Sequence, residues 1–463
     1  MTDTIAALAT ARGLSALAVV RVSGPEATAI VASRLSRPAA DEVRASAGRT
    51  VHVGWLTGSD GARLDHVVCT VFRGPASATG EDVVEVTTHG GDAAPQAALR
   101  ALYGAGARPA APGEFTQRAF LNGKLDLSQA EAVADLIHAS STLGRRAALA
   151  GLTGRIAEAV ANVRAALVQT AALVELELDF GDEDVEFADR DALRALLAEA
   201  DGLLADLVGT ARLGALARDG VRAVLGGRPN AGKSTLLNAL VGTSRAIVSP
   251  TPGTTRDAVE AEAEIGEIRF RFLDTAGLRE TADAVEAEGT RRARAAIEAA
   301  DVLVYVWDAA LGLDAEERAV LDGLAARRPD LGVIRVANKA DTLPEGALAD
   351  GAPDDGTLVL SAHAALSEPS HLDGLRGALL DAARGDLSDS EGSVVAVNER
   401  HRAHLDAARA AVGRARAALD RGGGGDTLAL DLRAALHELG QVTGAVTNED
   451  VLDAVFSQFC IGK

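Results

Sequence analysis

The first 123 residues have the hydrophobic pattern of short strands separated by turns. Apolar and polar residues alternate through "ALAVVRVSG", "RTVHVGWLTG", "DHVVCTVFRGP" and "EDVVEVTTHGG", and a helix-like run, "APQAALRALYGAG", accompanies them. Short runs with period-two alternation, bounded by glycine, predict β-strands. Residues 1–123 are therefore predicted to form a small α+β domain.

From Leu125 the pattern becomes typical of long helices. Apolar residues recur at helical spacing without proline until "GDEDVEF" interrupts them, and the helical pattern then returns from Ala188 to Arg218. After "GDLSDSEGS" the chain is helical again, through "NERHRAHLDAARAAVGRARAALD" and "DTLALDLRAALHELGQVTG". We expect two helical segments, at residues 124–219 and 384–463.

Between these segments, apolar runs alternate with helices. The runs "VRAVLGG", "IRFRFLDTAG", "DVLVYVWDAA", "GVIRVANKAD" and "TLVLSAH" each end in a polar turn. Strands that are buried on both faces and alternate with helices indicate a doubly wound parallel sheet, here over residues 220–383. The simplest architecture is a multidomain α/β protein in which this domain is inserted between two halves of one helical domain.

Length, charge and cysteine content narrow the classes of protein. The chain has 463 residues, enough for roughly three domains, and a net charge of −20, so any contact with nucleic acid needs a local basic patch. Its two cysteines cannot form a disulfide framework, which indicates a reducing compartment. No segment approaches the roughly 18 apolar residues of a membrane span, and the apolar run at 14–20 lacks the basic flank of a signal peptide. We expect a soluble, cytoplasmic protein that does not contact a membrane.

The stretch "GGRPNAGKSTLLN" is a candidate phosphate-binding loop. It follows the strand "VRAVL", opens a helix-favouring run and fits G-x-x-x-x-G-K-[ST] from Gly227 to Ser234. Backbone N–H groups of such a loop cup phosphates at a helix N-terminus. Lys233 adds a charge for the β- and γ-phosphates, and the Ser234 hydroxyl can bind Mg²⁺.

Further motifs follow in the order expected of a GTP-binding domain. "TPGTTRD" offers Thr254 or Thr255 as a switch threonine, and "DTAG" brings a carboxylate near the metal. In "NKAD", Asp341 can accept both N–H groups of the guanine edge, which separates GTP from ATP by roughly 3–5 kcal/mol. "SAH" would support the base. The candidate nucleotide-binding residues are Asn230, Ala231, Gly232, Lys233, Ser234, Thr235, Ser249, Thr254, Thr255, Asp274, Thr275, Ala276, Gly277, Asn338, Lys339, Asp341, Ser361, Ala362 and His363.

The motifs do not identify the side chain that positions the attacking water. Ras-like enzymes place a glutamine directly after the "DTAG" glycine, but here Leu278 occupies that position. The acids Glu280, Asp283, Glu286 and Glu288 follow, and none stands out by position. Arg256 or Arg279 could act as an arginine finger. Asn230 could bind a small cation or simply form a turn.

The carboxy terminus, "FSQFCIGK", places Cys460 four positions from the end. Three interpretations compete: a lipid-attachment box, a nucleophile or ligand that returns to a site, or no role at all. Prenylation is disfavoured, because Gly462 and Lys463 suit that box poorly and no polybasic run precedes it.

Taken together, these stretches resemble the MnmE (TrmE) family of tRNA-modification GTPases. The resemblance is carried by "APGEFTQRAFLNGKLDLSQAEAVADLI", "DFGDEDVEF", "GRPNAGKSTLLNAL", "GTTRD", "DTAGLRETADAVEAEG", "NKAD" and "FSQFCIGK", which extend to the last residue. It implies an N-terminal folate-binding and dimerisation domain, a discontinuous helical domain and an inserted Ras-like P-loop G domain.

For GTP hydrolysis, the resemblance implies potassium in place of an arginine finger when two G domains meet. The implied potassium ligands are Asn230, Ser249, Thr251 and Thr254, and the implied magnesium ligands are Ser234 and Thr255. Glu286 would align the attacking water. The implied catalytic residues are therefore Glu286 and Lys233, with Cys460 as a further hypothesis.

The resemblance also implies a folate site and a reaction. Arg21, Glu85, Lys124 and Lys463 match the family's ligands for 5-formyl- or methylene-tetrahydrofolate, and the "CIGK" tail would return towards them. The implied function is modification of the wobble uridine of certain tRNAs at C5, together with the flavoprotein MnmG (GidA), by a homodimer. The alternative is a regulatory GTPase of ribosome assembly, which needs a basic RNA-binding appendage that the sequence does not contain.

Overall fold

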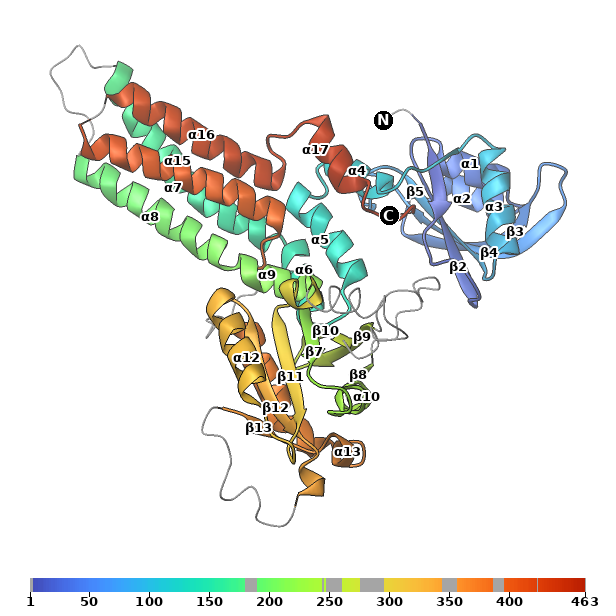
Figure 1. The fold of residues 1–463 in the computed structure, drawn as a ribbon. Helices are drawn as coiled ribbons and strands as arrows, with labels where there is room; N and C mark the ends of the chain where they lie inside the picture. Colours follow the sequence, from blue (N-terminus) through green and yellow to red (C-terminus); the bar gives the residue numbers. More distant parts are fainter. Residues whose placement is uncertain are drawn as a thin grey trace. The chain divides into compact units, whose positions relative to one another are not determined.

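The computed structural model describes residues 3–179, 190–243, 245–246, 260–274, 295–343, 356–385, 395–422 and 424–462. The chain divides into two compact units, coloured along the sequence in Figure 1. Unit 1 comprises Met1–Ala134, Gly151–Val208 and Arg400–Lys463, and unit 2 comprises Asp135–Ala150 and Gly209–Glu399. The predicted candidates Ser249, Thr251, Thr254, Thr255, Thr275, Ala276, Gly277, Glu286 and Lys463 lie outside the described residues.

Unit 1 begins with a six-stranded sheet of order β3-β4-β5-β2-β1-β6, antiparallel except for the pair β1–β6. In β4 the alternate residues Val67, Cys69 and Val71 are buried, as the period-two pattern predicts. Three helices cover this face and share its core. The elements are β1 (Ile5–Leu8), β2 (Leu17–Ser23), α1 (Ala27–Ser33), α2 (Ala39–Ala45), β3 (Thr50–Thr57), β4 (Arg63–Phe72), β5 (Val83–His89), α3 (Ala93–Tyr103) and β6 (Arg108–Pro109).

The rest of unit 1 is helical, and the two predicted helical segments pack together. Asp201 of α8 accepts hydrogen bonds from Arg409 and Arg416 of α15, and Glu175 of α7 pairs with Arg433 of α16. Figure 1 shows these four helices side by side. The helices are α4 (Glu114–Leu121), α5 (Leu127–His138), α7 (Arg155–Asp179), α8 (Arg190–Gly209), α15 (Glu399–Asp420), α16 (Gly425–Thr443) and α17 (Glu449–Phe456). Between α5 and α7 comes α6 (Thr142–Leu152), most of which belongs to unit 2.

Within the described residues, one segment of α7, Arg155–Leu176, is long and apolar enough by length and composition to cross a membrane. The prediction that no segment approaches this length was therefore wrong. A core helix of a soluble protein meets the same criterion, and α7 packs along α16. The buried residues of α7 recur at helical spacing: Ile156, Val160, Val163, Leu167 and Val174.

Unit 2 contains a seven-stranded sheet of order β13-β12-β11-β7-β10-β9-β8. Strands β7 and β10 to β13 are parallel, as predicted, but β9 runs antiparallel to both of its neighbours, β10 and β8, so the sheet is mixed. The cause is a two-residue turn at Gly266 and Glu267, both with positive φ, which forms a tight hairpin between β9 and β10. The strands are β7 (Val221–Gly226), β8 (Arg245–Ala246), β9 (Glu260–Ile265), β10 (Ile268–Asp274), β11 (Val302–Asp308), β12 (Gly332–Asn338) and β13 (Leu358–Val359).

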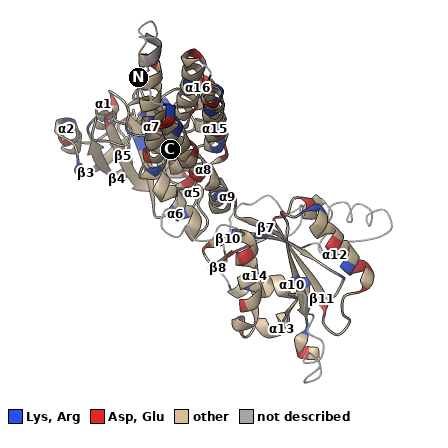
Figure 2. Cartoon of the chain, turned by 90° about the vertical axis from the view of Figure 1, so that its left-hand side faces the viewer, with Lys and Arg blue, Asp and Glu red and all other residues tan. Residues whose placement is uncertain are grey.

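Helices flank this sheet. Phe270, Phe272 and Val304 lie in its core, which also includes side chains of α9 and α6. Figure 2 shows acidic and basic residues at neighbouring positions along α12. The helices are α9 (Ala211–Asp219), α10 (Lys233–Thr243), α12 (Ala315–Arg327), η2 (Ala340–Thr342), α13 (Ala362–Ala365), η3 (Pro369–Leu372) and α14 (Asp373–Arg384).

Candidate functional site

Several of the predicted nucleotide residues that the structure describes lie at one edge of the sheet of unit 2. Strands β7, β10, β11 and β12 end at Gly226, Asp274, Asp308 and Asn338, and the strand register pairs Leu225 with Asp274 and Asp308 with Asn338. Ligands of open α/β sheets bind beyond the carboxyl ends of the strands. The phosphate loop and the "NKAD" loop therefore share one edge.

The phosphate loop needs glycine at two positions for steric reasons. A Cβ at Gly227 would lie 1.9 Å from the carbonyl oxygen of Val306, and one at Gly232 would lie 2.2 Å from Nδ2 of Asn338. Both glycines have positive φ, and so does Asn230 between them. The backbone therefore curls closely around the start of α10, the arrangement that presents N–H groups to phosphate.

Lys233 and Ser234 are the first two residues of α10, and both side chains form hydrogen bonds within this site. Lys233 is buried, and its Nζ donates to the carbonyl oxygens of Gly227 and Arg228 at 3.0 and 2.8 Å. The Ser234 hydroxyl donates to Oδ2 of Asp274 at 2.7 Å. A hydroxyl and a carboxylate oxygen in contact are hard ligands of the kind that Mg²⁺ takes, so these residues fit that ion.

Asn338 joins the "NKAD" loop to the phosphate loop. Its Nδ2 donates to the carbonyl oxygen of Ala231, and its Oδ1 accepts from the N–H of Ala362, each at 2.8 Å. Asp341 accepts a hydrogen bond from the Ser361 hydroxyl at 2.5 Å. The motifs "NKAD" and "SAH" therefore form one structure, in which the Asp341 carboxylate is fixed by the serine.

One residue of this edge was missed by sequence reasoning. Asp308, the last residue of β11, accepts from Nζ of Lys339 at 2.9 Å, and this hydrogen bond lowers the pKa of the Asp308 carboxyl. Lys339 itself has positive φ. The signal was available, because Asp308 is an acid at the carboxyl end of the apolar run "VLVYVW".

The predicted folate residues lie in unit 1 on adjacent strands. Arg21 of β2 is paired in register with Glu85 of β5, and its Nε and Nη2 donate to Glu85 Oε1 at 3.0 and 2.8 Å. The Arg21 guanidinium also lies over the ring of Phe115, 5.7 Å from its centroid. The side chain of Lys124 lies beside Gly80.

The tail returns to the N-terminal sheet. Ile461 forms a β-bridge with Pro112, and the N–H of Gly113 donates to the carbonyl oxygen of Cys460. Gly462 fits so closely that a Cβ there would lie 2.1 Å from the carbonyl oxygen of Leu8. The register of β1 and β2 pairs Ala7 with Arg21, so Gly462 lies beside the strand adjacent to the one that carries Arg21. The Cys460 residue is exposed.

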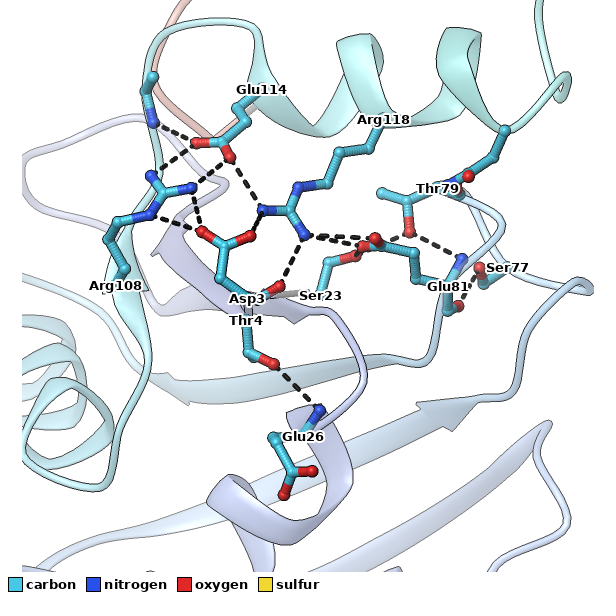
Figure 3. A network of polar contacts seen from close by, with 12 residues as sticks. Asp3, Thr4, Ser23, Glu26, Ser77, Thr79, Glu81, Arg108, Glu114 and Arg118 are labelled. Carbon is cyan, nitrogen blue, oxygen red and sulfur yellow. Dashed lines mark hydrogen bonds and ion pairs between the residues drawn. The ribbon is translucent and has the colours of Figure 1, made fainter. Parts of the chain in front are cut away.

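An ionic network is centred on Arg118 in unit 1 (Figure 3). Arg118 is fully buried and donates to Asp3, Glu81 and Glu114. Burial opposes ionisation of Glu114, but hydrogen bonds from Arg108, the Ala111 N–H and Arg118 outweigh it and lower the pKa of Glu114. The network explains two residues of "GEFTQRAF" structurally: they hold α4 against the segment that leads into β1.

The fold and the site of unit 2 define a P-loop guanine-nucleotide-binding domain. The chain matches two family models, "GTP-binding protein TrmE N-terminus" over residues 4–124 and "MnmE helical domain" over residues 127–460. The chain belongs to the MnmE (TrmE) family of tRNA-modification GTPases. The predicted family and the predicted multidomain α/β fold class are confirmed.

Three relatives, each named "tRNA modification GTPase MnmE", align along the whole chain. The relative from Salinibacter ruber is 56% identical over 463 residues, which is 100% of this chain and 99% of the relative. That from Cytophaga hutchinsonii is 41% identical over 462 residues, or 100% and 98% of the two chains. That from Symbiobacterium thermophilum is 42% identical over 473 residues, or 100% and 99%.

Proposed function

We propose that this protein binds and hydrolyses GTP and that hydrolysis drives modification of certain tRNAs at C5 of the wobble uridine. The proposal rests on one observation. Asn338 forms hydrogen bonds with both the phosphate loop and Ala362 of the "SAH" motif, and the Ser361 hydroxyl of that motif holds the Asp341 carboxylate. The tRNA substrate is taken from the names of relatives that align end to end with the chain.

The described residues have separate tasks in hydrolysis. When GTP binds, the Lys233 ammonium would give up its hydrogen bonds to the loop carbonyls and contact the β- and γ-phosphates instead. Ser234, which lies beside Asp274, would hold Mg²⁺ together with Thr255. When bound, Mg²⁺ neutralises charge on the phosphates. Glu286 aligns the attacking water, the task that Leu278 has no polar group to perform.

Potassium is proposed to take the place of an arginine finger. Asn230 supports this role, because it is exposed within the phosphate loop and has a positive φ of 59°. A side-chain oxygen there can bind a monovalent cation next to the phosphates. Ser249, Thr251 and Thr254 are the further proposed ligands.

A reduced folate is proposed to supply the one-carbon unit. Arg21 and Glu85 retain 20% and 28% exposure, so a ligand can reach both. A carboxylate suits the donor edge of a pterin, and Lys124 and Lys463 suit the carboxylates of its tail. We assign the exposed Cys460 to the neighbourhood of the folate carbon or the uridine.

The proposed setting is a cytoplasmic homodimer that works with the MnmG flavoprotein. With a net charge of −20, this chain leaves much of the electrostatic attraction of tRNA to that partner. The homodimer is supported by an exposed apolar face on strand β3, formed by Val51, Val53 and Trp55.

The GTPase proposal is tested by steady-state hydrolysis of GTP and ATP by the full chain. We expect a clear preference for GTP, and Asp341→Asn should lower kcat/KM for GTP by roughly a hundredfold, because two charge-assisted bonds are weakened. Asp373→Asn, an exposed acid on α14, is the control and should leave the rate unchanged. Equal use of ATP and GTP would contradict the proposal.

The same assay in KCl and in NaCl at equal ionic strength tests the cation. Hydrolysis should be much faster in potassium, and Asn230→Ala should remove the difference. Equal rates in both salts would reject potassium while leaving the GTPase proposal intact.

A further inference from the structure

Arg228 lies in the phosphate loop, but its side chain is held by the helix that follows β11. Its Nε and Nη2 donate to the two carboxylate oxygens of Glu317 at 2.7 and 2.6 Å, and Nη2 also pairs with Asp314. A bidentate arginine–carboxylate pair fixes direction as well as distance. The loop is therefore attached to the N-terminus of α12.

The acceptors of this arginine are themselves held in place. Asp314 and Glu317 form a capping box, in which each side chain accepts from the other residue's N–H. The Tyr305 hydroxyl donates to Glu317 Oε1 at 2.8 Å. The Tyr305 ring lies against Gly226, because a Cβ on that glycine would be 3.3 Å from the ring. We call Arg228, Tyr305, Asp314 and Glu317 the loop clamp.

The backbone of Arg228 contacts the lysine of the site. Its carbonyl oxygen accepts from Lys233 Nζ at 2.8 Å. The guanidinium and the carbonyl belong to one residue, so holding the side chain also limits where this carbonyl, and the first half of the loop, can move.

We propose that Arg228 is a positioning residue whose clamp keeps the phosphate loop in its nucleotide-binding shape before the nucleotide arrives. This inference rests on the proposed function, since it takes a guanine nucleotide as the ligand. Preorganisation raises affinity by reducing the ordering that binding requires. Loss of the clamp should therefore weaken nucleotide binding and speed nucleotide release.

An ordinary surface ion pair makes a different prediction, because exposed pairs contribute little. Arg228 and Asp314 are partly exposed, at 38% and 54%, whereas the Glu317 side chain is 14% exposed and takes part in three contacts. A matched control exists on the same helix. Arg335 of β12 pairs with Asp322 of α12 at 2.7 Å, away from the loop.

The test is the affinity and release rate of a fluorescent GDP analogue, measured on the full chain. We expect Arg228→Gln to raise Kd about tenfold and Arg228→Lys to recover part of the loss. Glu317→Gln should act in the same direction, and the double variant should be no weaker than Arg228→Gln alone. Arg335→Gln should stay within about twofold of wild type.

The binding measurements distinguish failure of the proposed function from failure of the loop clamp. If wild type binds no guanine nucleotide, the proposed function is wrong. If wild type binds and Arg228→Gln binds equally well, or if Arg335→Gln loses as much, the clamp is wrong. Multiplying losses in the double variant would also overturn it, because the two residues would then act independently. Circular dichroism of each variant checks that it is folded. Glu317→Gln tests the clamp by changing the acceptor of the hydrogen bonds and leaving Arg228 in place.

Discussion

Within unit 1, the buried carboxylate of Glu131 contacts side chains from another helix. This residue of α5 accepts from Arg400 Nε and Nη2 at 2.6 and 2.9 Å and lies 2.6 Å from Nε2 of His401. Arg400 also donates to the carbonyl oxygens of Gln441 and Val442 near the end of α16. The Glu131–Arg400 ion pair therefore connects three helices, α5, α15 and α16.

The pKa of Glu131 leads to a pH prediction. Burial opposes its ionisation, but the hydrogen bonds from Arg400 and the close approach of the His401 imidazole outweigh burial and hold the pKa at about 2. A lowered folded-state pKa stabilises the fold above the unfolded value near 4.5, and that contribution is lost as the pH falls towards 2. We expect Glu131→Gln to lower the free energy of unfolding at pH 7 by about 3 kcal/mol, and the gap to wild type to narrow below pH 4.5.

Urea unfolding at a series of pH values measures this gap. Glu175→Gln is the control, because its pair with Arg433 is exposed on both sides and should contribute less than about 1 kcal/mol. A gap that is absent at pH 7, or that stays constant down to pH 3, would contradict this role of Glu131.

At the scale of elements, strand β3 presents an apolar face away from the core of its sheet. Val51, Val53 and Trp55 are 62%, 55% and 37% exposed, and Val68, the ladder partner of Val53 on β4, is 37% exposed. Contiguous exposed apolar side chains on a sheet mark an interaction surface. A second copy of the chain fits the proposed homodimer.

Val53→Asp should dissociate that dimer, because it places a charge at the centre of the apolar face. Size-exclusion chromatography with light scattering should give the dimer mass for wild type and the monomer mass for the variant. Leu430→Asp, at a leucine of α16 that is 69% exposed, should remain a dimer. If wild type is a monomer, or if Val53→Asp keeps the dimer mass, this face is not the dimer interface.

Much of the element layout could be predicted because its causes are local. Period-two and helical spacing indicated the strands and helices, and glycine, lysine and serine in a fixed order indicated the phosphate loop. The antiparallel β9 was not predicted, since it depends on two positive φ angles at Gly266 and Glu267. The partners of Arg118 were also out of reach, because Asp3 is 115 positions away in the sequence.

At the scale of the whole molecule, the proposed chemistry is divided between two compact units. The nucleotide residues belong to unit 2, whereas Arg21, Glu85, Lys124 and the tail belong to unit 1. The chain crosses between the units next to Ala134, Ala150, Val208 and Glu399. If GTP hydrolysis drives modification, a conformational change in unit 2 must therefore alter the site in unit 1. Variants should be able to separate GTP hydrolysis from tRNA modification.

The most direct test of the central claim is nucleoside mass spectrometry of tRNA, with GTP hydrolysis followed in the same reactions. The reactions contain this protein, the flavoprotein partner, a reduced folate, and either GTP or ATP. The account predicts a C5-modified wobble uridine with GTP only, neither hydrolysis nor product for Lys233→Ala, and normal hydrolysis without product for Cys460→Ser. Rapid GTP hydrolysis by wild type with no modified uridine would contradict the account, and unaltered modification by Cys460→Ser would remove the thiol from it.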